Sequence, residues 1–250
     1  EFKLKEIDKD RLYTFLREME FNRLLSSAIS AYGEPNFEGN KKVLKDNFNT
    51  PKISKKEYHL IQDYLEIDSW IKEAEEEGEV AFDTETNSLD PHTAELVGIS
   101  LSTKIGKACY IPIGHKSKKS LDKKMVLNQL KPLLEDTSVK KIGQNIKFDF
   151  IILFYQGINI SSMEDTMLMS YVLDAGKNRH NMDTLSKIHL SHKTISFKEL
   201  VGTGKKEINF SEVDIEKAKD YAAEDADITL RLYKKFYKFL KEQKLINIYE

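Results

Sequence analysis

The chain has 250 residues, of which 40% are hydrophobic and 32% are charged, a composition typical of a soluble globular protein. Its 39 basic and 41 acidic residues give a formal net charge of −2, without the basic excess that many nucleic-acid-binding proteins carry. The single cysteine, Cys109, excludes an internal disulfide and fits a reducing, cytoplasmic compartment. No apolar run approaches the ~18 residues that span a bilayer, so no membrane partner is expected.

The N-terminal part of the chain reads as an extension ahead of a larger domain. Residues 34–56 are poor in apolar residues and rich in Asn, Lys and Pro, which is typical of a linker. We therefore expect a helical extension and linker over residues 1–56 and one domain over residues 57–250. The first residue, which is not Met, and the stop within a Lys-rich helical pattern indicate a piece of a longer polypeptide. The extension is predicted to hold one amphipathic helix over residues 9–30, with an apolar stripe at Leu12, Phe15, Leu16, Met19, Leu24, Leu25 and Ala28.

From residue 57 onward, strand-like and helix-like patterns alternate, which indicates an open α/β or α+β layer fold. Short polar connections join the second, third and fourth predicted strands, so we expect them to form an antiparallel meander. Strands are predicted at residues 57–62, 79–85, 96–103, 108–113, 139–143 and 158–160. Helices are predicted at residues 67–77, 126–134, 147–155, 165–173 and 214–242, with short helices within 178–199.

Two carboxylates stand at the end of the strand predicted at residues 79–85. Asp83 and Glu85 are two residues apart, so they point to the same face of the sheet. Their mutual repulsion costs stability unless a cation or a proton relieves it. A lone pair of this kind is most often a solvated strand end, so its meaning depends on whether other acids converge on it.

Two later segments supply candidates for that convergence. Asp149 lies in the first turn of the helix predicted at 147–155, where the alternative role is a favourable charge against the helix dipole. Tyr221 and Asp225 are four residues apart on the last helix, so they share one of its faces. Neighbouring alanines keep that helix slim and allow a close approach to the sheet. Other acids of this helix are expected on its solvated faces: Asp220, Glu224 and Asp227.

Together these residues predict a two-metal site. Four carboxylates provide the hard oxygen ligands that suit Mg²⁺ or Mn²⁺ better than Zn²⁺, which prefers Cys and His. Two such ions, ~3.5–4 Å apart, stabilise the attacking and leaving oxygens of a phosphoryl displacement. A phenol beside them can hold the attacking water in line. Each motif alone is a weak signal, but their order and spacing together favour a site for phosphoryl displacement.

Three segments resemble the motifs of one enzyme family: FDTETNSLD, GQNIKFD and YAAEDADITL. They are similar to the 3′→5′ proofreading exonuclease domain of bacterial family A DNA polymerases, the DNA polymerase I family, in its DEDDy group. Residues 165–173, 179–186 and 192–200 share the likeness, which runs from about residue 57 to 245. Residues 9–28 resemble the stretch that joins the 5′ nuclease region to this domain. The resemblance implies a ribonuclease H-like fold, α/β with a mixed sheet flanked by helices, and a polymerase domain of the same parent chain that is absent here.

The resemblance also implies catalytic roles for five residues. Asp83 would bridge two metal ions, and Glu85 and Asp225 would complete the first metal site, where Zn²⁺ is an alternative to Mg²⁺ or Mn²⁺. Asp149 would hold the second ion near the leaving 3′ oxygen. Tyr221 would orient the nucleophilic water together with Glu85.

The substrate implied by the resemblance is a single-stranded DNA 3′ end or a frayed primer terminus, cleaved to 5′-mononucleotides by a bacterial, cytoplasmic monomer. Leu89 and Phe197 match positions that wedge or stack against the terminal bases, and stacking is tolerant of sequence, as proofreading requires. Phe148 stands where relatives often have Tyr. The full set of substrate-binding residues expected from the resemblance is Thr84, Leu89, Gln144, Asn145, Arg179 and Phe197.

Two other functions stay open. One is a ribonuclease D-like exonuclease that trims RNA, which a comparison of single-stranded DNA with RNA would separate. The other is a catalytically silent DNA-binding scaffold, as in polymerases that keep the domain after losing its acids. The presence of all four acids and the tyrosine argues against this second alternative.

Overall fold

The computed structural model describes residues 7–19, 21–33, 56–116, 120–204 and 207–250. The chain divides into two compact units, Glu1–Asn49 and Thr50–Glu250. The linker predicted over residues 34–56 lies outside the described residues except for Lys56, and the domain boundary at residue 56 stays a prediction.

The described residues of the N-terminal unit form two helices where the sequence predicts one. The break falls within the five-residue step between Met19 and Leu24, which is the irregular step of the predicted apolar stripe. A continuous helix would turn these two side chains onto different faces, whereas the break lets each segment keep its own apolar face. The two helices are α1 (Lys9–Glu18) and α2 (Asn22–Tyr32).

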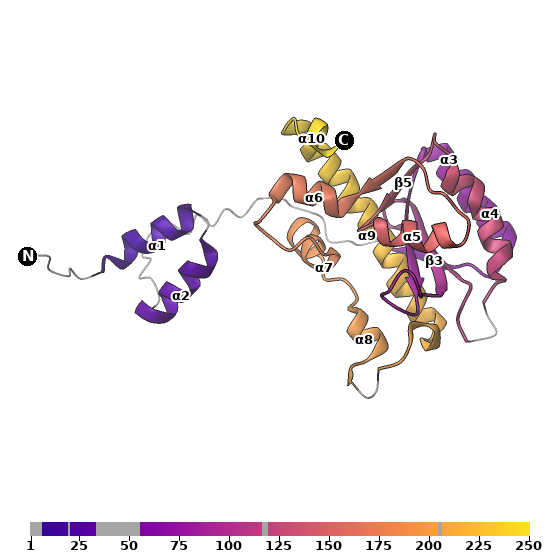
Figure 1. Cartoon of the computed structure of the whole chain (residues 1–250), viewed down its shortest axis with the longest axis horizontal. Coiled ribbons are helices and arrows are strands. Elements are labelled where there is room, and N and C mark those ends of the chain that lie inside the picture. Colours follow the sequence, from indigo (N-terminus) through magenta and orange to yellow (C-terminus); the bar gives the residue numbers. More distant parts are fainter. Residues whose placement is uncertain (1–6, 20, 34–55, 117–119, 205–206) are drawn as a thin grey trace, which may run out of the picture. The chain divides into compact units, whose positions relative to one another are not determined.

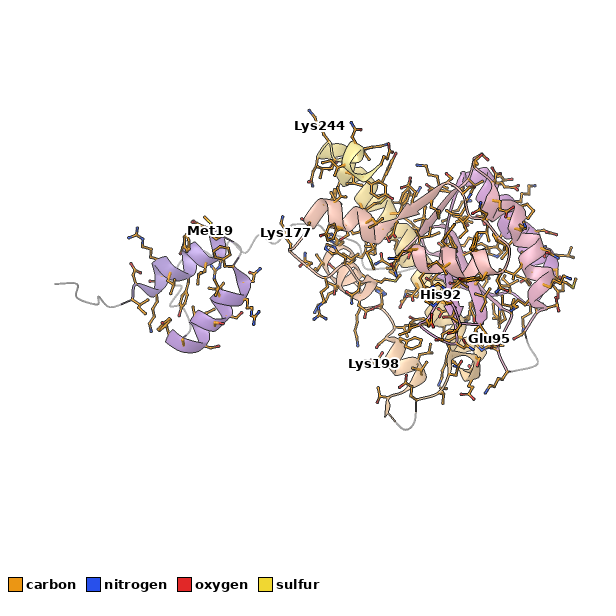
Figure 2. The ribbon with its side chains drawn as sticks, viewed as in Figure 1. Met19, His92, Glu95, Lys177, Lys198 and Lys244 are labelled. Atoms are coloured by element: carbon orange, nitrogen blue, oxygen red, sulfur yellow. The ribbon has the colours of Figure 1, made fainter. Side chains whose placement is uncertain are left out.

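A six-stranded mixed sheet forms the centre of the second unit (Figure 1). Its strands are β1 (Glu57–Leu60), β2 (Glu79–Thr86), β3 (Leu96–Lys104), β4 (Lys107–Pro112), β5 (Lys140–Gly143) and β6 (Met163–Asp165). They lie in the order β1-β4-β3-β2-β5-β6. The meander prediction is confirmed, because β3 is antiparallel to both β2 and β4, while β1 runs parallel to β4 and β5 parallel to both β2 and β6.

Helices cover both faces of this sheet, so the fold class is the predicted α/β one (Figure 1). Val80 and Phe82 of β2 point into a core shared with α3 (Tyr64–Glu77), α4 (Lys123–Glu135) and α5 (Lys147–Tyr155). Ala81, between them, points to the opposite face. The helices on that face are α6 (Thr166–Asp174), α9 (Ile215–Glu242) and α10 (Ile246–Tyr249).

The 28-residue helix α9 lies directly against the sheet because its inner face is lined by alanines. Ala218, Ala222, Ala223 and Ala226 are fully buried, and the small side chains let the helix backbone approach β3 and β4 closely. The close approach predicted from these alanines is confirmed. It brings Tyr221 and Asp225, which lie between the alanines, to the end of β2.

The segment between α6 and α9 consists of short elements, as predicted for residues 178–199. Residues 191–196 form an extended link between two of them. The elements are α7 (Met182–Leu185), the π-helical turn η1 (Ser186–Leu190), α8 (Phe197–Val201) and the 3₁₀ turn η3 (Phe210–Glu212).

One strand prediction in the second unit is wrong, and two helices, α3 and α4, begin three residues earlier than predicted. The strand expected at residues 158–160 is absent among the described residues, and the edge strand is β6. Ile158 and Ile160 are buried in the core, so their alternation with Asn159 reflects a loop packed onto that core instead of a strand in the sheet. Helix α3 begins earlier than predicted, because the side chain of Asp63 accepts a hydrogen bond from the Leu65 amide and caps it.

Candidate active site

Three carboxylates converge where β2 meets α9. Asp83 and Glu85 follow Ala81 on the β2 face that packs against α9, and Asp225 comes from the helix itself. One oxygen from each of these carboxylates lies within 4.8 Å of the others. The alternation of β2 therefore places the predicted pair on one face, and the alanines of α9 bring the third acid to it.

The fourth predicted acid, Asp149, lies beside this group but is held by Thr84. The Thr84 amide donates to Oδ1 of Asp149 at 2.9 Å, and its hydroxyl Oγ1 donates to the same oxygen at 2.5 Å. Asp149 is buried in the first turn of α5. Its charge raises the pKa values of Asp83 and Glu85, which shows that the four acids share one electrostatic environment.

Burial and mutual repulsion raise the pKa values of these acids. Burial, followed by the charges of the neighbouring acids, raises the pKa of Asp83 and of Glu85 well above their usual values. Burial also raises the pKa of Asp149 to about 7, against the hydrogen bonds from Thr84, and that of Asp225 to about 8. Several acids with raised pKa values in one place are a frequent mark of a functional site.

The donor set fits a divalent cation. Oε1 of Glu85 is buried and has no hydrogen-bond partner among the described residues. A buried carboxylate oxygen without a partner is costly, and a cation in the space between the three acids would satisfy it. The ligands are all carboxylates, which favours Mg²⁺ or Mn²⁺.

Tyr221 stands over the acids on the same face of α9 as Asp225. Burial, and then the charges of Asp225 and Glu85, raise the pKa of its phenol, which also hydrogen-bonds Asp225. The hydroxyl therefore stays protonated at neutral pH. Its ring lies 6.0 Å from that of Phe197 and 6.1 Å from that of Phe210, centroid to centroid, so two aromatic rings fix its orientation.

These residues line a groove of ≈ 950 Å³ beside the sheet edge. The side chains on its rim come from the loop after β2, from the end of β5, and from α8. Leu89 is 90% exposed and Phe197 is 41% exposed, so both present apolar surface to the groove. The predicted site residues that line it are Asp83, Thr84, Glu85, Leu89, Gln144, Asn145, Phe197, Tyr221 and Asp225.

Two of the predicted substrate-binding residues, Gln144 and Asn145, also have local structural features of their own. The Gln144 side chain donates to the His180 carbonyl at 2.8 Å and accepts from the Thr166 hydroxyl at 2.5 Å. Asn145 has a left-handed backbone with φ 60°, a strained conformation that occurs often at functional sites. Arg179 is exposed on the loop next to His180 and is not among the residues that line the groove.

Two acids of α9 are buried where the sequence places them in solvent. Glu224 is 1% exposed and Asp227 is fully buried, and only Asp220 is solvated as predicted. The helical spacing correctly separates their faces from that of Asp225. It does not show that the 191–196 segment and β1 cover those faces.

Further residues that line the groove were not predicted as site residues. They come from the end of β2 and the loop after it, from α5, from the turn before α7 and from the segment before α9: Thr86, Asn87, Ser88, Phe148, Asn181, Glu207, Ile208, Asn209 and Phe210. Asn209 donates a side-chain hydrogen bond to the Asn87 carbonyl at 2.9 Å, which joins the segment before α9 to the loop that carries Leu89. The alternation of apolar Ile208 and Phe210 with polar Asn209 could have indicated that this segment packs beside the site. The sequence of residues 202–210 otherwise has the pattern of a simple loop.

A family model described as "3′-5′ exonuclease" matches residues 58–241. The chain belongs to this exonuclease family. It is 38% identical over 242 residues to DNA polymerase I of Pseudomonas aeruginosa, covering 94% of this chain and 26% of that protein. It is 42% identical over 230 residues to DNA polymerase I of Rhizobium leguminosarum, covering 84% and 22%. The chain thus spans about a quarter of the length of these relatives.

Solved structures share the fold of the exonuclease domain at low sequence identity. NrnC of Brucella melitensis bound to pGG gives a TM-score of 0.60 at 23% identity, covering 78% of this chain and 87% of that one. The catalytic core of RRP6 from Trypanosoma brucei gives 0.59 at 14% identity, covering 78% and 53%. The predicted ribonuclease H-like fold is confirmed. Within the described ranges, no helix has the length and apolar character needed to cross a membrane.

Proposed function

We propose that this exonuclease domain hydrolyses the 3′-terminal phosphodiester of single-stranded or frayed DNA and releases 5′-mononucleotides. The observation that carries the proposal is the convergence of Asp83, Glu85 and Asp225, with Asp149 beside them, in an open groove. The relatives are DNA polymerases, which supports DNA as the substrate and proofreading as the role.

The four acids would hold two divalent ions, Mg²⁺ or Mn²⁺. Asp83, Glu85 and Asp225 would bind the first, for which Zn²⁺ is an alternative, and Asp149 together with Asp83 would bind the second. Bound there, such ions activate a water molecule and stabilise the charge that develops on the phosphate. For Asp149 this requires Thr84 to share or release the oxygen that it now holds.

The remaining residues of the groove would position the substrate. The protonated Tyr221 hydroxyl would hold the attacking water with Glu85. Leu89 and Phe197 would contact the terminal bases by stacking and wedging, which does not read sequence. A mismatched end unpairs at lower cost than a matched end, so selectivity needs no base readout. We further propose that the domain acts as a monomer in the bacterial cytoplasm, beside the polymerase domain of its parent chain.

The experiment that tests this function compares 5′-labelled single strands of DNA and RNA with equal sequence. We expect Mg²⁺-dependent shortening of the DNA from its 3′ end, with mononucleotides as the product. We also expect a mismatched primer terminus to be shortened faster than a matched one. The appearance of dinucleotides or of internal cuts would contradict the proposal.

The second candidate is RNA trimming, which the fold shared with NrnC and RRP6 favours. A faster shortening of RNA than of DNA would support it in place of the first. A silent scaffold is the third. It would be supported if a calorimetric titration with millimolar Mn²⁺ showed no binding to the chain.

A further inference from the structure

Glu224 is a buried acid of α9 that stands next to Asp225 in the chain but faces away from the acidic cluster. It is 1% exposed. Its Oε2 accepts a hydrogen bond from the Ile195 amide at 2.6 Å, and its Oε1 lies 2.9 Å from Nε2 of His192. The same Oε1 receives an ion pair from Lys56. Both carboxylate oxygens are therefore used.

The partners of Glu224 lie in the segment 191–196, which connects η1 to α8. This segment begins at Ser191, a non-glycine residue with φ 52°, and has no regular secondary structure. Two further side-chain hydrogen bonds hold the segment: the Thr194 hydroxyl donates to Oδ1 of Asp183 at 2.7 Å, and the Ser186 hydroxyl donates to the His192 carbonyl at 3.1 Å. Immediately after the segment comes Phe197, the first residue of α8.

The segment thus determines where the Phe197 ring lies. That ring stacks on Phe210 with centroids 6.3 Å apart and an interplanar angle of 3°, and it lies against Tyr221. Ile195 and Phe197 line a second hollow of ≈ 160 Å³ that also reaches Tyr221 and Asp225. We call the stacked rings of Phe197 and Phe210 the Phe197 platform. Glu224 links this platform to α9, the helix that also carries Asp225.

We propose that Glu224 is a positioning residue that fixes the Phe197 platform at its distance from the acidic cluster and so sets the affinity for the 3′-terminal base. The proposal rests on the proposed function, because it assumes that Phe197 contacts that base. Hydrogen bonds to a charged acceptor are among the stronger ones in proteins, and loss of this acceptor leaves the Ile195 amide unpaired. A loosened segment 191–196 would then let the ring move.

The chain offers a matched control one turn further along the same helix. Asp227 is also a buried carboxylate with both oxygens engaged: Oδ2 accepts from the Tyr58 hydroxyl at 2.9 Å, and Oδ1 accepts from the Gly106 amide at 2.7 Å and from Arg231. Its partners lie in β1, in the β3–β4 turn and on α9 itself. None of these residues lines the groove.

The test uses the variants Glu224→Ala and Glu224→Gln of the full 250-residue chain, with Asp227→Asn as control. A single-stranded DNA with 2-aminopurine at its 3′ terminus reports stacking in EDTA, where no hydrolysis occurs. We expect Glu224→Ala to weaken binding of the terminal base and to raise KM by ~10-fold, with kcat changed by less than ~3-fold. Glu224→Gln keeps one oxygen acceptor and should show a smaller effect, and Asp227→Asn should leave KM unchanged.

A double variant separates this role from general loosening. In a Phe197→Ala background, Glu224→Ala should raise KM by less than ~2-fold more, because the platform that it positions is already gone. Equal effects in the two backgrounds, or an unchanged KM in a folded Glu224→Ala and Glu224→Gln, would overturn the proposal. If Phe197→Ala alone leaves KM and the 2-aminopurine signal unchanged, then Phe197 does not contact the terminal base and the proposal for Glu224 is wrong as well. A wild-type chain that shortens no DNA would instead contradict the proposed function.

Discussion

Tyr221 shows how a single side chain at this site is specified by its neighbours. Its ring is fixed between Phe197 and Phe210, and its hydroxyl faces the acids with the proton retained. A phenol in this setting can donate a hydrogen bond without becoming an anion. It therefore fits the role of a water-positioning group and not that of a general base.

Tyr221→Phe should lower kcat for single-stranded DNA by about 10- to 100-fold, because one hydrogen bond in a buried site is worth ~1–3 kcal/mol. The ring contacts with Phe197 and Phe210 are kept, so KM and the midpoint of thermal unfolding should change little. Single-turnover shortening of a 5′-labelled strand measures the effect. An unchanged kcat would show that the hydroxyl does not act on the water.

At the residue scale, the sequence predicted the positions of the acids better than their surroundings. The spacing within D-x-E and Y-x-x-x-D places Asp83 with Glu85 and Tyr221 with Asp225, because strand and helix periods fix which residues share a face. The burial of Glu224 could not be predicted in this way. It depends on a segment thirty residues earlier that folds across the helix.

At the scale of elements, the site depends on how closely α9 approaches the sheet. Ala222 belongs to a buried cluster with Val97 and Tyr110, and Gly98 of β3 leaves room for the Tyr110 ring. A Cβ at Gly98 would lie 2.1 Å from the Tyr110 hydroxyl oxygen. Tyr110 is fully buried and its hydroxyl lies 2.7 Å from Nε2 of His115, so it has little freedom to move.

Gly98→Ala should therefore destabilise the chain by ~1–3 kcal/mol, the usual cost of an added methyl group in a packed core. Chemical denaturation followed by circular dichroism measures this free energy of unfolding. In a Tyr110→Leu background the same substitution should cost less, since the ring that meets the new methyl is absent. Equal costs in both backgrounds would contradict the packing described for β3.

The sequence predicted most elements but not all of their limits. A long periodic segment such as the helix predicted at residues 214–242 matches α9 (Ile215–Glu242) to within one residue, because a helical pattern of this length has no competing interpretation. Short apolar runs were ambiguous: residues 158–160 alternate like a strand but belong to a buried loop. The single helix predicted at residues 9–30 is two helices, because the apolar stripe contains an irregular five-residue step that one helix would place on two faces.

For the whole molecule, the net charge is small, but four acids lie together at one site: Asp83, Glu85, Asp149 and Asp225. The four acids have pKa values above their unfolded-state values, so the folded chain binds protons more tightly than the unfolded chain. Folding stability is then greatest when these groups are protonated. It falls as pH rises from the unfolded pKa values of ~4 towards the folded values of about 7 for Asp149 and about 8 for Asp225.

We therefore expect the metal-free chain to lose thermal stability between about pH 5 and about pH 8. Millimolar Mg²⁺ or Mn²⁺ should oppose this loss, because bound cations remove the repulsion, and the stabilisation by metal should be larger at the higher pH. Asp225→Asn should show a weaker pH dependence without metal and a smaller gain from metal. Differential scanning calorimetry across this range measures both effects, and a wild-type stability that rises with pH while metal gives no gain would contradict the cluster as described.

The central claim is that Asp83 and Glu85 of β2 make this domain a metal-dependent exonuclease. The double variant Asp83→Ala with Glu85→Ala tests this claim most directly. Wild-type chain and variant are incubated with a 5′-labelled single-stranded DNA and Mg²⁺, after circular dichroism has shown that both are folded. We expect stepwise 3′→5′ shortening by the wild type and none by the variant. A folded double variant that still shortens the strand would contradict the claim.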